Sequence, residues 1–259
     1  MLAPAQIPER YLAWNRQHGA PSGFQVRGLR WKSKIWPKER LLGPFSIQTN
    51  NTTRRFEYPW AFESGRVGPG MRILEIGGSL CGLQFVLSKL GCHTVNIDPG
   101  MAAAGVGWPC DGNSIAKLNR IFGTQVELLN TTIEKAGLKP GSFDRAFCIS
   151  VIEHLPKSDA QHVMREVHRA LKPGGLFVLT VDLFLNLQPF CSRVSNEYGE
   201  NLNLFEILDS KDWKITVGNK EEIQGFPEFN RENILGNLDR YLIGNYPVLV
   251  QCLVLEKIG

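Results

Sequence analysis

Residues 71–82, which read MRILEIGGSLCG, constrain the fold of this chain more than any other segment. A short apolar run carries an acidic residue, Glu75, near its end, and a glycine-rich turn then opens an amphipathic segment. This order predicts a buried parallel strand whose carboxyl end holds a nucleotide-like ligand. Glycines let the backbone approach a ligand closely, and a helix N-terminus presents unpaired N–H groups to it. The turn therefore predicts an α/β sheet with a ligand site at this strand end.

From residue 70 onward, strand-like and helix-like patterns alternate. Apolar runs typical of strands occupy 71–76, 93–98, 125–130, 144–151 and 176–182, and helical candidates lie between them at 79–90, 112–122 and 158–171. Strands separated by helices favour a parallel sheet that is covered on both faces. With two further strand candidates, 213–217 and 248–255, we expect a doubly wound, mostly parallel seven-stranded α/β sheet.

Two segments, 1–60 and 183–245, lie outside this alternation. We expect residues 1–60 to form a cover over substrate and cofactor, and residues 61–259 to form the core, with 183–245 as a cap-like insertion. The insertion is rich in aromatic residues that could wall an apolar pocket, although most are expected to form its own core: Phe184, Phe190, Tyr198, Phe205, Phe226, Phe229 and Tyr241.

Composition is ordinary for a globular protein of 259 residues, with 43% hydrophobic and 21% charged residues. No apolar stretch approaches the roughly 18–20 residues of a membrane span, and the N-terminus has no apolar signal region. The six cysteines are scattered, with no C-x-x-C pair. We therefore expect reduced thiols, no metal site, no membrane partner and a cytoplasmic monomer or homodimer.

Positive charge is concentrated in residues 26–40. This stretch contains six basic residues and one acidic residue, Glu39, interleaved with Trp31 and Trp36; the basic residues are Arg27, Arg30, Lys32, Lys34, Lys38 and Arg40. The pattern favours a solvated basic face whose tryptophans pack on the body of the protein. The alternative is a surface that grips a nucleic acid or another anion.

The acidic residue before the turn helps to choose the ligand. Gly77 and Gly82 fit a dinucleotide fingerprint, but Ser79 replaces its middle glycine, and the sequence after the turn excludes a P-loop. Glu75 would place negative charge near a pyrophosphate, whereas it suits a ligand with a positive group, such as the amino group of S-adenosylmethionine. Asp98, which ends the second strand, can accept hydrogen bonds from both hydroxyls of a ribose.

Four motifs in register resemble those of the class I S-adenosylmethionine-dependent methyltransferases. They are 74–82 (LEIGGSLCG), 96–99 (NIDP), 142–155 (SFDRAFCISVIEHL) and 170–177 (ALKPGGLF). The resemblance covers about 70–182 and implies a Rossmann-like fold, methyl transfer, and S-adenosyl-L-methionine as cofactor with S-adenosyl-L-homocysteine as product. Two features depart from the family pattern: Ser79 alters the glycine turn, and 130–132 (NTT) stands where the family has an acidic residue.

The resemblance also implies roles for single residues. Glu75 would serve the amino end of the cofactor's methionine, Asp98 its ribose hydroxyls, and Thr131 or Thr132 the adenine edge. The rest of the implied cofactor set comprises the turn and the strand ends: Gly77, Gly78, Ser79, Gly82, Pro99, Ser150 and Val151. Two readings compete with these roles: Ser79 could instead cap the following helix, and Thr131 and Thr132 could be strand-end and turn residues.

The segment 50–60 is dense in polar and aromatic residues, and Pro59 favours a loop there. In this loop, Arg55 could pair with the cofactor's carboxylate while Tyr58 closes over it. The alternative is a linker that docks Phe56 and Trp60 on the edge of the sheet.

Methyl transfer needs positioning above all, and a base only where the acceptor must lose a proton. His154, three residues past the fourth strand, is the leading candidate for that base, with Glu153 and Asp182 as alternatives. His154 could also be a histidine that simply bonds to backbone. The motifs of base-amino and cytosine C5 methylation are missing after the fourth strand, which favours methylation of an oxygen or nitrogen of a small molecule, as in natural-product metabolism. RNA methylation through residues 26–40 and a non-catalytic cofactor-binding protein remain as alternatives.

Overall fold

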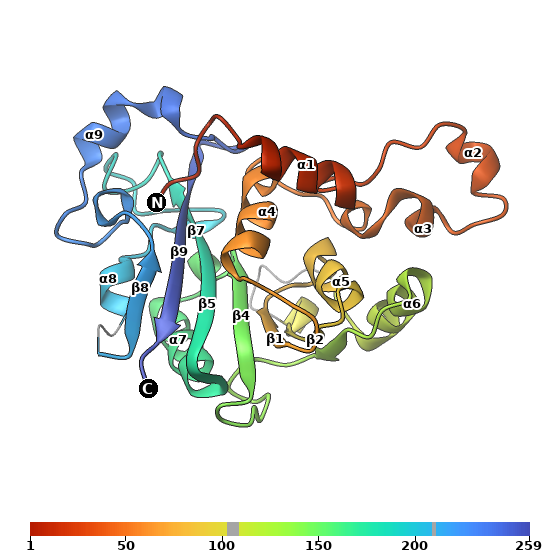
Figure 1. Cartoon of the computed structure of the whole chain (residues 1–259). Coiled ribbons are helices and arrows are strands. Elements are labelled where there is room, and N and C mark those ends of the chain that lie inside the picture. Colours follow the sequence, from red (N-terminus) through yellow and green to blue (C-terminus); the bar gives the residue numbers. More distant parts are fainter. Residues whose placement is uncertain (103–108, 209–210) are drawn as a thin grey trace.

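Seven strands form one sheet in the order β3-β2-β1-β4-β5-β9-β8 (Figure 1). The structure is a computed structural model that describes residues 1–102, 109–208 and 211–259. The strands are β1 (Arg72–Ile76), β2 (His93–Ile97), β3 (Glu127–Leu129), β4 (Phe143–Ile149), β5 (Leu171–Phe184), β8 (Trp213–Val217) and β9 (Val248–Lys257). The first five run parallel, and β9 is antiparallel to both β5 and β8. The predicted doubly wound, mostly parallel seven-stranded sheet is confirmed.

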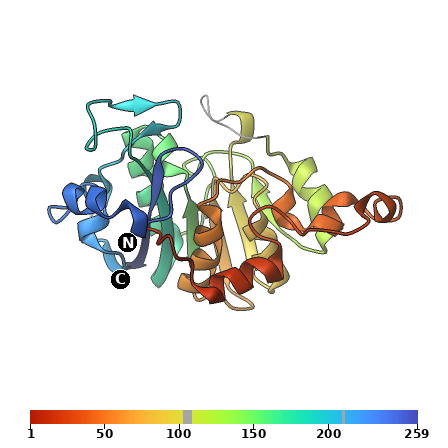
Figure 2. The same ribbon diagram turned by 90° about the horizontal axis from the view of Figure 1, so that it is seen from above.

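Helices cover both faces of this sheet (Figure 2). On one face lies α7 (Lys157–Ala170), and on the other lie α1 (Glu9–His18), α4 (Arg54–Ser64) and α5 (Gly82–Lys89). Successive residues of β1 serve the two layers, because Ile73 packs with α4 and α5 whereas Leu74 packs with α7. A strand buried on both sides explains the continuous apolar run in the sequence.

Apart from α6 (Gly112–Phe122), which is as long as α4, the remaining elements are short. They are α2 (Leu29–Lys32), α3 (Lys38–Leu42), η1 (Pro44–Ser46), η2 (Gly100–Ala102), η3 (Ile152–His154), β6 (Ser195–Asn196), β7 (Gly199–Glu200), α8 (Leu204–Ile207), η4 (Lys220–Glu222), α9 (Arg231–Gly236) and η5 (Leu238–Arg240). Within the three described ranges, no helix has the length and apolar character needed to cross a bilayer.

The N-terminal residues are built into the main body. The backbone N–H of Ala3 donates to the carbonyl of Val250 in β9, at 3.0 Å, and the N-terminal amine of Met1 donates to the carbonyl of Cys252, at 2.9 Å. Ala3 and Tyr11 of α1 belong to the same buried cluster as Val250. Part of the segment 1–60 therefore completes the core.

Residues 54–64 form helix α4, so the predicted loop at Pro59 is wrong. Proline inside a helix leaves the carbonyl four residues earlier without its N–H partner. Here that carbonyl belongs to Arg55, and the side-chain amide of Asn15 in α1 donates to it at 2.8 Å. A neighbouring helix thus replaces the missing hydrogen bond, and nothing in the local sequence reveals that contact.

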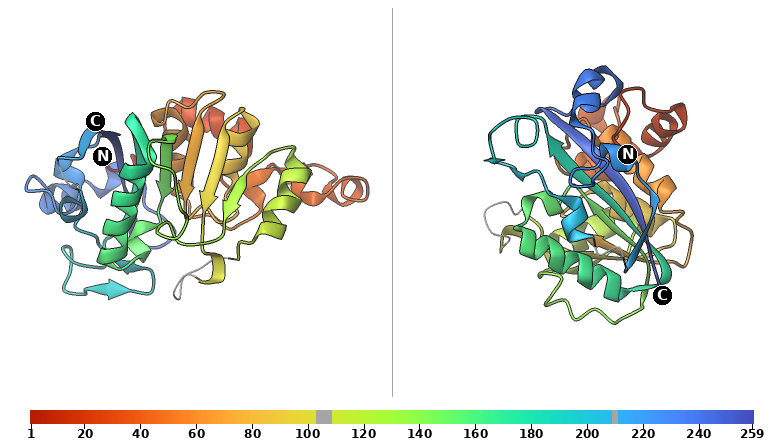
Figure 3. Two further views of the ribbon diagram at one scale, coloured as in Figure 1. Left: turned by 90° about the horizontal axis from the view of Figure 1, so that it is seen from below. Right: turned by 90° about the vertical axis from the view of Figure 1, so that its left-hand side faces the viewer.

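Residues 24–42, which include α2 and α3, form a lobe that projects beyond α6 (Figures 1 and 3). The expectation that its tryptophans pack on the body is wrong, because Trp31 is 72% exposed and Trp36 is 46% exposed. Each ring packs instead against a cation of the same lobe, Lys34 over Trp31 and Arg40 over Trp36.

Candidate active site

The glycine turn after β1 is packed closely against neighbouring side chains. Gly77 takes a φ of 65°, in the left-handed region, and a Cβ atom there would lie 2.6 Å from Cγ1 of Val151. A Cβ atom on Gly78 would lie 2.8 Å from the carboxyl carbon of Glu75. Neither position therefore has room for a side chain, and only glycine fits there.

Ser79 also lies in the left-handed region, with a φ of 44°. It holds the conformation that the missing glycine would have taken, at a cost of roughly 1–2 kcal/mol for a residue with a Cβ atom. Its backbone N–H donates to Oδ2 of Asp98 at 2.7 Å. The predicted capping role is wrong, because Cys81 occupies the N-cap position of α5 and the side chain of Ser79 makes no cap bond.

Glu75 is buried beside this turn. The thiol of Cys81 donates to its Oε1 atom at 3.0 Å, whereas Oε2 has no hydrogen-bond partner within the described residues. Burial raises the pKa of Glu75 to about 7. An unpartnered buried carboxylate oxygen is unfavourable alone and fits the amino group of a ligand in the turn.

Asp98 connects the ends of β1 and β2. It is only 6% exposed, and its two carboxylate oxygens accept from the backbone N–H groups of Ser79 and Gly100, each at 2.7 Å. Burial raises its pKa although these bonds oppose the shift. At the end of β3, the side-chain amide of Asn130 donates to the carbonyl of Asp98 at 2.8 Å. Of the two threonines predicted for the adenine edge, Thr131 is half-buried and Thr132 is exposed. Pro99 is half-buried beside Asp98.

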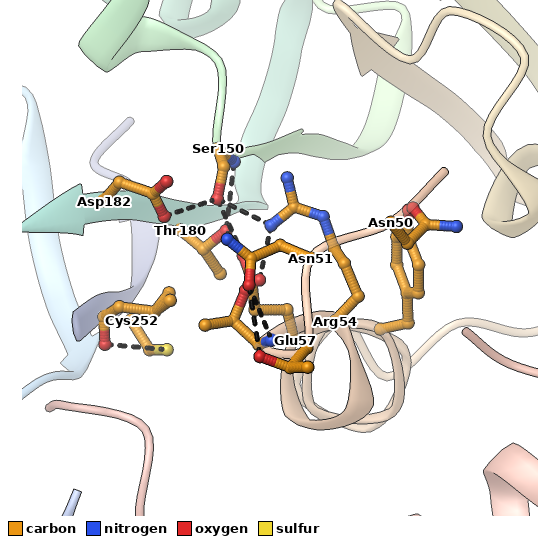
Figure 4. Close-up of polar contacts among 12 residues, drawn as sticks. Asn50, Asn51, Arg54, Glu57, Ser150, Thr180, Asp182 and Cys252 are labelled. Carbon is orange, nitrogen blue, oxygen red and sulfur yellow. Dashed lines mark hydrogen bonds and ion pairs between the residues drawn. The ribbon is translucent and has the colours of Figure 1, made fainter. Parts of the chain in front are cut away.

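A buried polar cluster lies at the carboxyl ends of β4 and β5 (Figure 4). The hydroxyl of Ser150 is its centre: it accepts from Nη1 of Arg54 at 2.8 Å and lies 2.8 Å from Oε1 of Glu57 and 3.2 Å from Oδ1 of Asp182. Arg54 and Glu57 form an ion pair within α4, and the hydroxyl of Thr180 donates to Glu57 at 2.7 Å. Ser150 itself has a φ of 48°, a strained value that recurs at functional sites.

The pKa values of the acids in this cluster are shifted in opposite directions. Burial alone would raise the pKa of Glu57, but the Arg54 guanidinium and the Thr180 hydroxyl outweigh it and lower that pKa. Burial and the neighbouring charge of Glu153 raise the pKa of Asp182 well above its usual range. Burial likewise raises the pKa of Glu153 to about 7. The single arginine of the cluster thus keeps Glu57 ionised, whereas the pKa values of Glu153 and Asp182 stay near neutral pH.

An aromatic wall adjoins Asp182. The hydroxyl of Tyr246 donates to Oδ2 of Asp182 at 3.0 Å, and the ring of Tyr246 stacks on Tyr198 with centroids 4.4 Å apart. Phe184, at the end of β5, stacks on both rings. Of the aromatic residues named in the insertion, Phe184 and Tyr198 therefore lie at the site. Tyr246 lies there too, and it was not predicted from the sequence.

The three predicted base candidates lie in different surroundings. Asp182 is in the cluster, and Oε1 of Glu153 accepts from the backbone N–H of Asp182 at 3.1 Å, while its Oε2 has no partner within the described ranges. Nδ1 of His154 is bonded to the carbonyl of Tyr198. His154 thus contacts the backbone of the β6–β7 hairpin. A hydrogen bond to backbone was the alternative to its role as a base.

The polar segment before the core uses a different arginine from the predicted one. Arg55 is exposed, whereas Arg54 points into the cluster. Tyr58 is buried, with its hydroxyl donating to Asn50 at 2.8 Å and its ring packed on Phe45. Gly82, at the start of α5, packs against Phe45, since a Cβ atom there would lie 2.5 Å from that ring. A spacing of three residues places Arg54 and Glu57 on one helix face, and this signal was available in the sequence.

The glycine turn and the polar cluster are neighbours, because Val151 contacts Gly77 and Ser150 precedes it. The sheet is Rossmann-like, with Glu75 and the glycine turn at the end of β1, Asp98 after β2 and Ser150 after β4. This arrangement defines a protein that binds a nucleoside ligand with a positive group. Comparison with known proteins gives the family.

The family described as "Methyltransferase domain" matches residues 74–179. The ubiquinone biosynthesis O-methyltransferase of Pseudomonas aeruginosa (strain UCBPP-PA14) is 29% identical over 174 residues, and the match covers 65% of this chain and 65% of that relative. Among solved structures, an S-adenosylmethionine-dependent methyltransferase from Mesorhizobium loti has a TM-score of 0.53 at 15% identity, covering 77% of this chain and 97% of that one. The [4+2]-cyclase SpnF has a TM-score of 0.54 at 15% identity and covers all of both chains.

Residues 74–179 match the methyltransferase-domain family, and this match together with the O-methyltransferase relatives supports a class I S-adenosylmethionine-dependent methyltransferase. The predicted family and its cofactor, S-adenosylmethionine, are thereby confirmed. Three features fit that cofactor: the glycine turn, the unpartnered oxygen of Glu75 and the buried carboxylate of Asp98.

Proposed function

We propose that this protein transfers the methyl group of S-adenosylmethionine to a hydroxyl oxygen of a small biosynthetic molecule of the natural-product kind. The observation that carries the proposal is the buried Asp182–Tyr246 pair beside Ser150, next to the glycine turn. Relatives named as O-methyltransferases support oxygen as the acceptor atom.

The cofactor's methionine end would lie along Gly77 and Gly78, with its amino group near Glu75, and its ribose hydroxyls near Asp98. Arg54 replaces Arg55 as the partner of the methionine carboxylate. Its side chain is 16% exposed, and only its Nη1 atom serves Glu57 and Ser150 in the cluster (Figure 4). The remaining N–H groups of the guanidinium suit a carboxylate ligand.

The acceptor hydroxyl would lie against Tyr246, which is half-buried and therefore reachable. S-adenosylmethionine would supply the methyl group for attack by the acceptor oxygen. The acceptor's proton would pass to the Tyr246 oxygen, and the proton of Tyr246 would pass to Asp182. An acid whose pKa is raised toward neutrality is suited to receive that proton. The stacked rings of Tyr198 and Phe184 would favour a flat, apolar acceptor.

The test is transfer of a radiolabelled methyl group from S-adenosylmethionine to a panel of phenols, catechols and aliphatic alcohols. Wild-type protein is expected to methylate a phenolic acceptor. Asp182→Asn and Tyr246→Phe should each lower kcat by about 10²- to 10⁴-fold, the usual contribution of a general base, while cofactor affinity stays within about twofold.

A matched control is Tyr241→Phe, since Tyr241 hydrogen-bonds Glu222 and not Asp182. Its kcat should equal that of the wild type. Methylation of amines or RNA in place of hydroxyls would overturn the proposal, as would cofactor binding with no transfer to any acceptor.

A further inference from the structure

The lobe of residues 24–42 presents large apolar side chains to solvent. Trp31 is 72% exposed, Ile35 is 77% exposed and Trp36 is 46% exposed. All three lie within six residues of the chain, and the lobe projects away from the sheet in Figure 1, in Figure 2 and in the left view of Figure 3. Three bulky apolar side chains grouped on a projecting element mark an interaction surface.

The lobe is held in place at its base. The backbone N–H of Phe24 donates to the carbonyl of Leu42 at 2.7 Å, which closes the two ends of the lobe. The ring of Phe24 fills the space above two glycines with left-handed backbone, Gly19 and Gly43. The exposed side chains therefore belong to an ordered element with a closed base.

Charge accompanies these apolar side chains. Exposed cations surround them, namely Arg27, Arg30, Lys32, Lys34, Lys38 and Arg40. The single acidic residue of the lobe, Glu39, pairs with Lys117 of α6 at 3.0 Å. Positive charge continues onto α6 through Arg120, which lines with Arg40 a cavity of about 400 Å³ between α3 and α6.

We propose that this lobe docks on the surface of a membrane that contains anionic phospholipid. Trp31, Ile35 and Trp36 enter the interfacial region, and the surrounding cations contact lipid phosphates. Aromatic rings with an adjoining cation suit the membrane interface, because the ring can contact the lipid acyl chains while the cation stays among the polar headgroups. This departs from the expectation that the protein has no membrane partner.

Membrane lipid fits this surface better than single-stranded nucleic acid. Bases bind by stacking on free aromatic faces. Here Lys34 lies 4.6 Å from the ring centroid of Trp31, and Arg40 lies 4.3 Å from that of Trp36, so one face of each ring is occupied. Ile35, the most exposed of the three, has no π-face and gains only from an apolar environment.

The test is co-sedimentation of the full chain with vesicles of phosphatidylcholine alone or with one-third phosphatidylglycerol. Binding is expected only to the vesicles with phosphatidylglycerol, and it should weaken at high salt. The Trp31→Ala/Ile35→Ala/Trp36→Ala variant should bind at least tenfold more weakly. A control of exposed apolar residues elsewhere, Val194→Ala/Phe205→Ala/Ile258→Ala, should bind like the wild type.

A second pair of variants tests the cations. Arg27→Gln/Arg30→Gln/Lys32→Gln/Lys34→Gln should lose binding, and Lys89→Gln/Lys135→Gln/Lys139→Gln/Arg165→Gln, which neutralises four exposed cations outside the lobe, should keep it. Equal binding by the apolar triple variant and the wild type would overturn the proposal. Binding of a single-stranded RNA oligonucleotide more tightly than of the anionic vesicles, lost in the same cation variant, would replace it with RNA recognition.

Discussion

Nη1 of Arg54 donates a hydrogen bond to Oγ of Ser150 at 2.8 Å. The contact joins helix α4, which precedes the segment matched by the methyltransferase family, to the end of β4 inside that segment. Ser150 directly precedes Val151, which packs on the glycine turn. A residue outside the family core thus completes the polar end of the site.

Arg54→Gln should destabilise the protein strongly. It removes the one cation that is bonded to the fully buried Glu57 within the described residues, and breaking a buried pair typically costs about 3–5 kcal/mol because the other charge is left uncompensated. Urea unfolding followed by circular dichroism measures this loss.

The matched control for that variant is Arg55→Gln, the exposed neighbour, whose unfolding free energy should stay within about 0.5 kcal/mol of the wild type. The double variant Arg54→Gln/Glu57→Gln should recover part of the loss, because it leaves neither charge of the pair buried without its partner. A double variant as unstable as the sum of the two single variants would contradict the ion-pair account.

Glu153→Gln should change how stability depends on pH. The folded-state pKa of Glu153 is raised from 4.5 to about 7, so between these values the folded protein holds a proton that the unfolded chain has lost. Its unfolding free energy therefore falls as pH rises through this window, by up to about 3 kcal/mol from this group. Glu75 and Asp182 act in the same direction.

The variant should show a shallower fall in unfolding free energy between pH 5 and pH 8, as measured by urea titrations at several pH values. Glu127→Gln, which replaces an exposed carboxyl on β3, serves as the control and should leave the slope unchanged. Identical slopes in Glu153→Gln and wild type would show that Glu153 titrates normally.

Gly77→Ala should impair cofactor binding. A Cβ atom there would lie 2.6 Å from Val151 on a backbone with a φ of 65°, and the left-handed strain alone costs about 1–2 kcal/mol. We expect at least a tenfold rise in the Kd for S-adenosylhomocysteine. Gly112→Ala, at the start of α6 with open space around it, should leave that Kd unchanged.

His154→Ala should affect acceptor binding more than turnover. Its ring is bonded to the carbonyl of Tyr198, whose own ring stacks on Tyr246. Loosening this hairpin is expected to raise the acceptor KM about tenfold and to change kcat less than threefold. A fall in kcat of a hundredfold or more with unchanged KM would restore His154 as the general base.

The positions of the strands along the chain and the glycine turn could be predicted because the necessary signals are local. The apolar run of β1, the spacing from Gly82 to Asp98 and the strand end at Ser150 each depend on neighbouring residues. Tyr246 was not predicted, since its partner lies 64 positions away. Arg54 was missed because the segment was taken for a loop, which hid its helical spacing from Glu57, and its other partner, Ser150, lies 96 positions away. Pro59 was misread for the same reason: the Asn15 amide that satisfies its helix lies on another element.

Binding of S-adenosylhomocysteine, followed by isothermal titration calorimetry, tests the central claim most directly. The wild-type protein should bind with a micromolar Kd, and Asp98→Ala should bind at least tenfold more weakly, because its carboxylate positions the turn and would hold the ribose. Asp159→Ala, an exposed aspartate on α7, should bind like the wild type. No binding by the wild type at millimolar ligand, or equal affinity in Asp98→Ala, would contradict the assignment of this site to the cofactor.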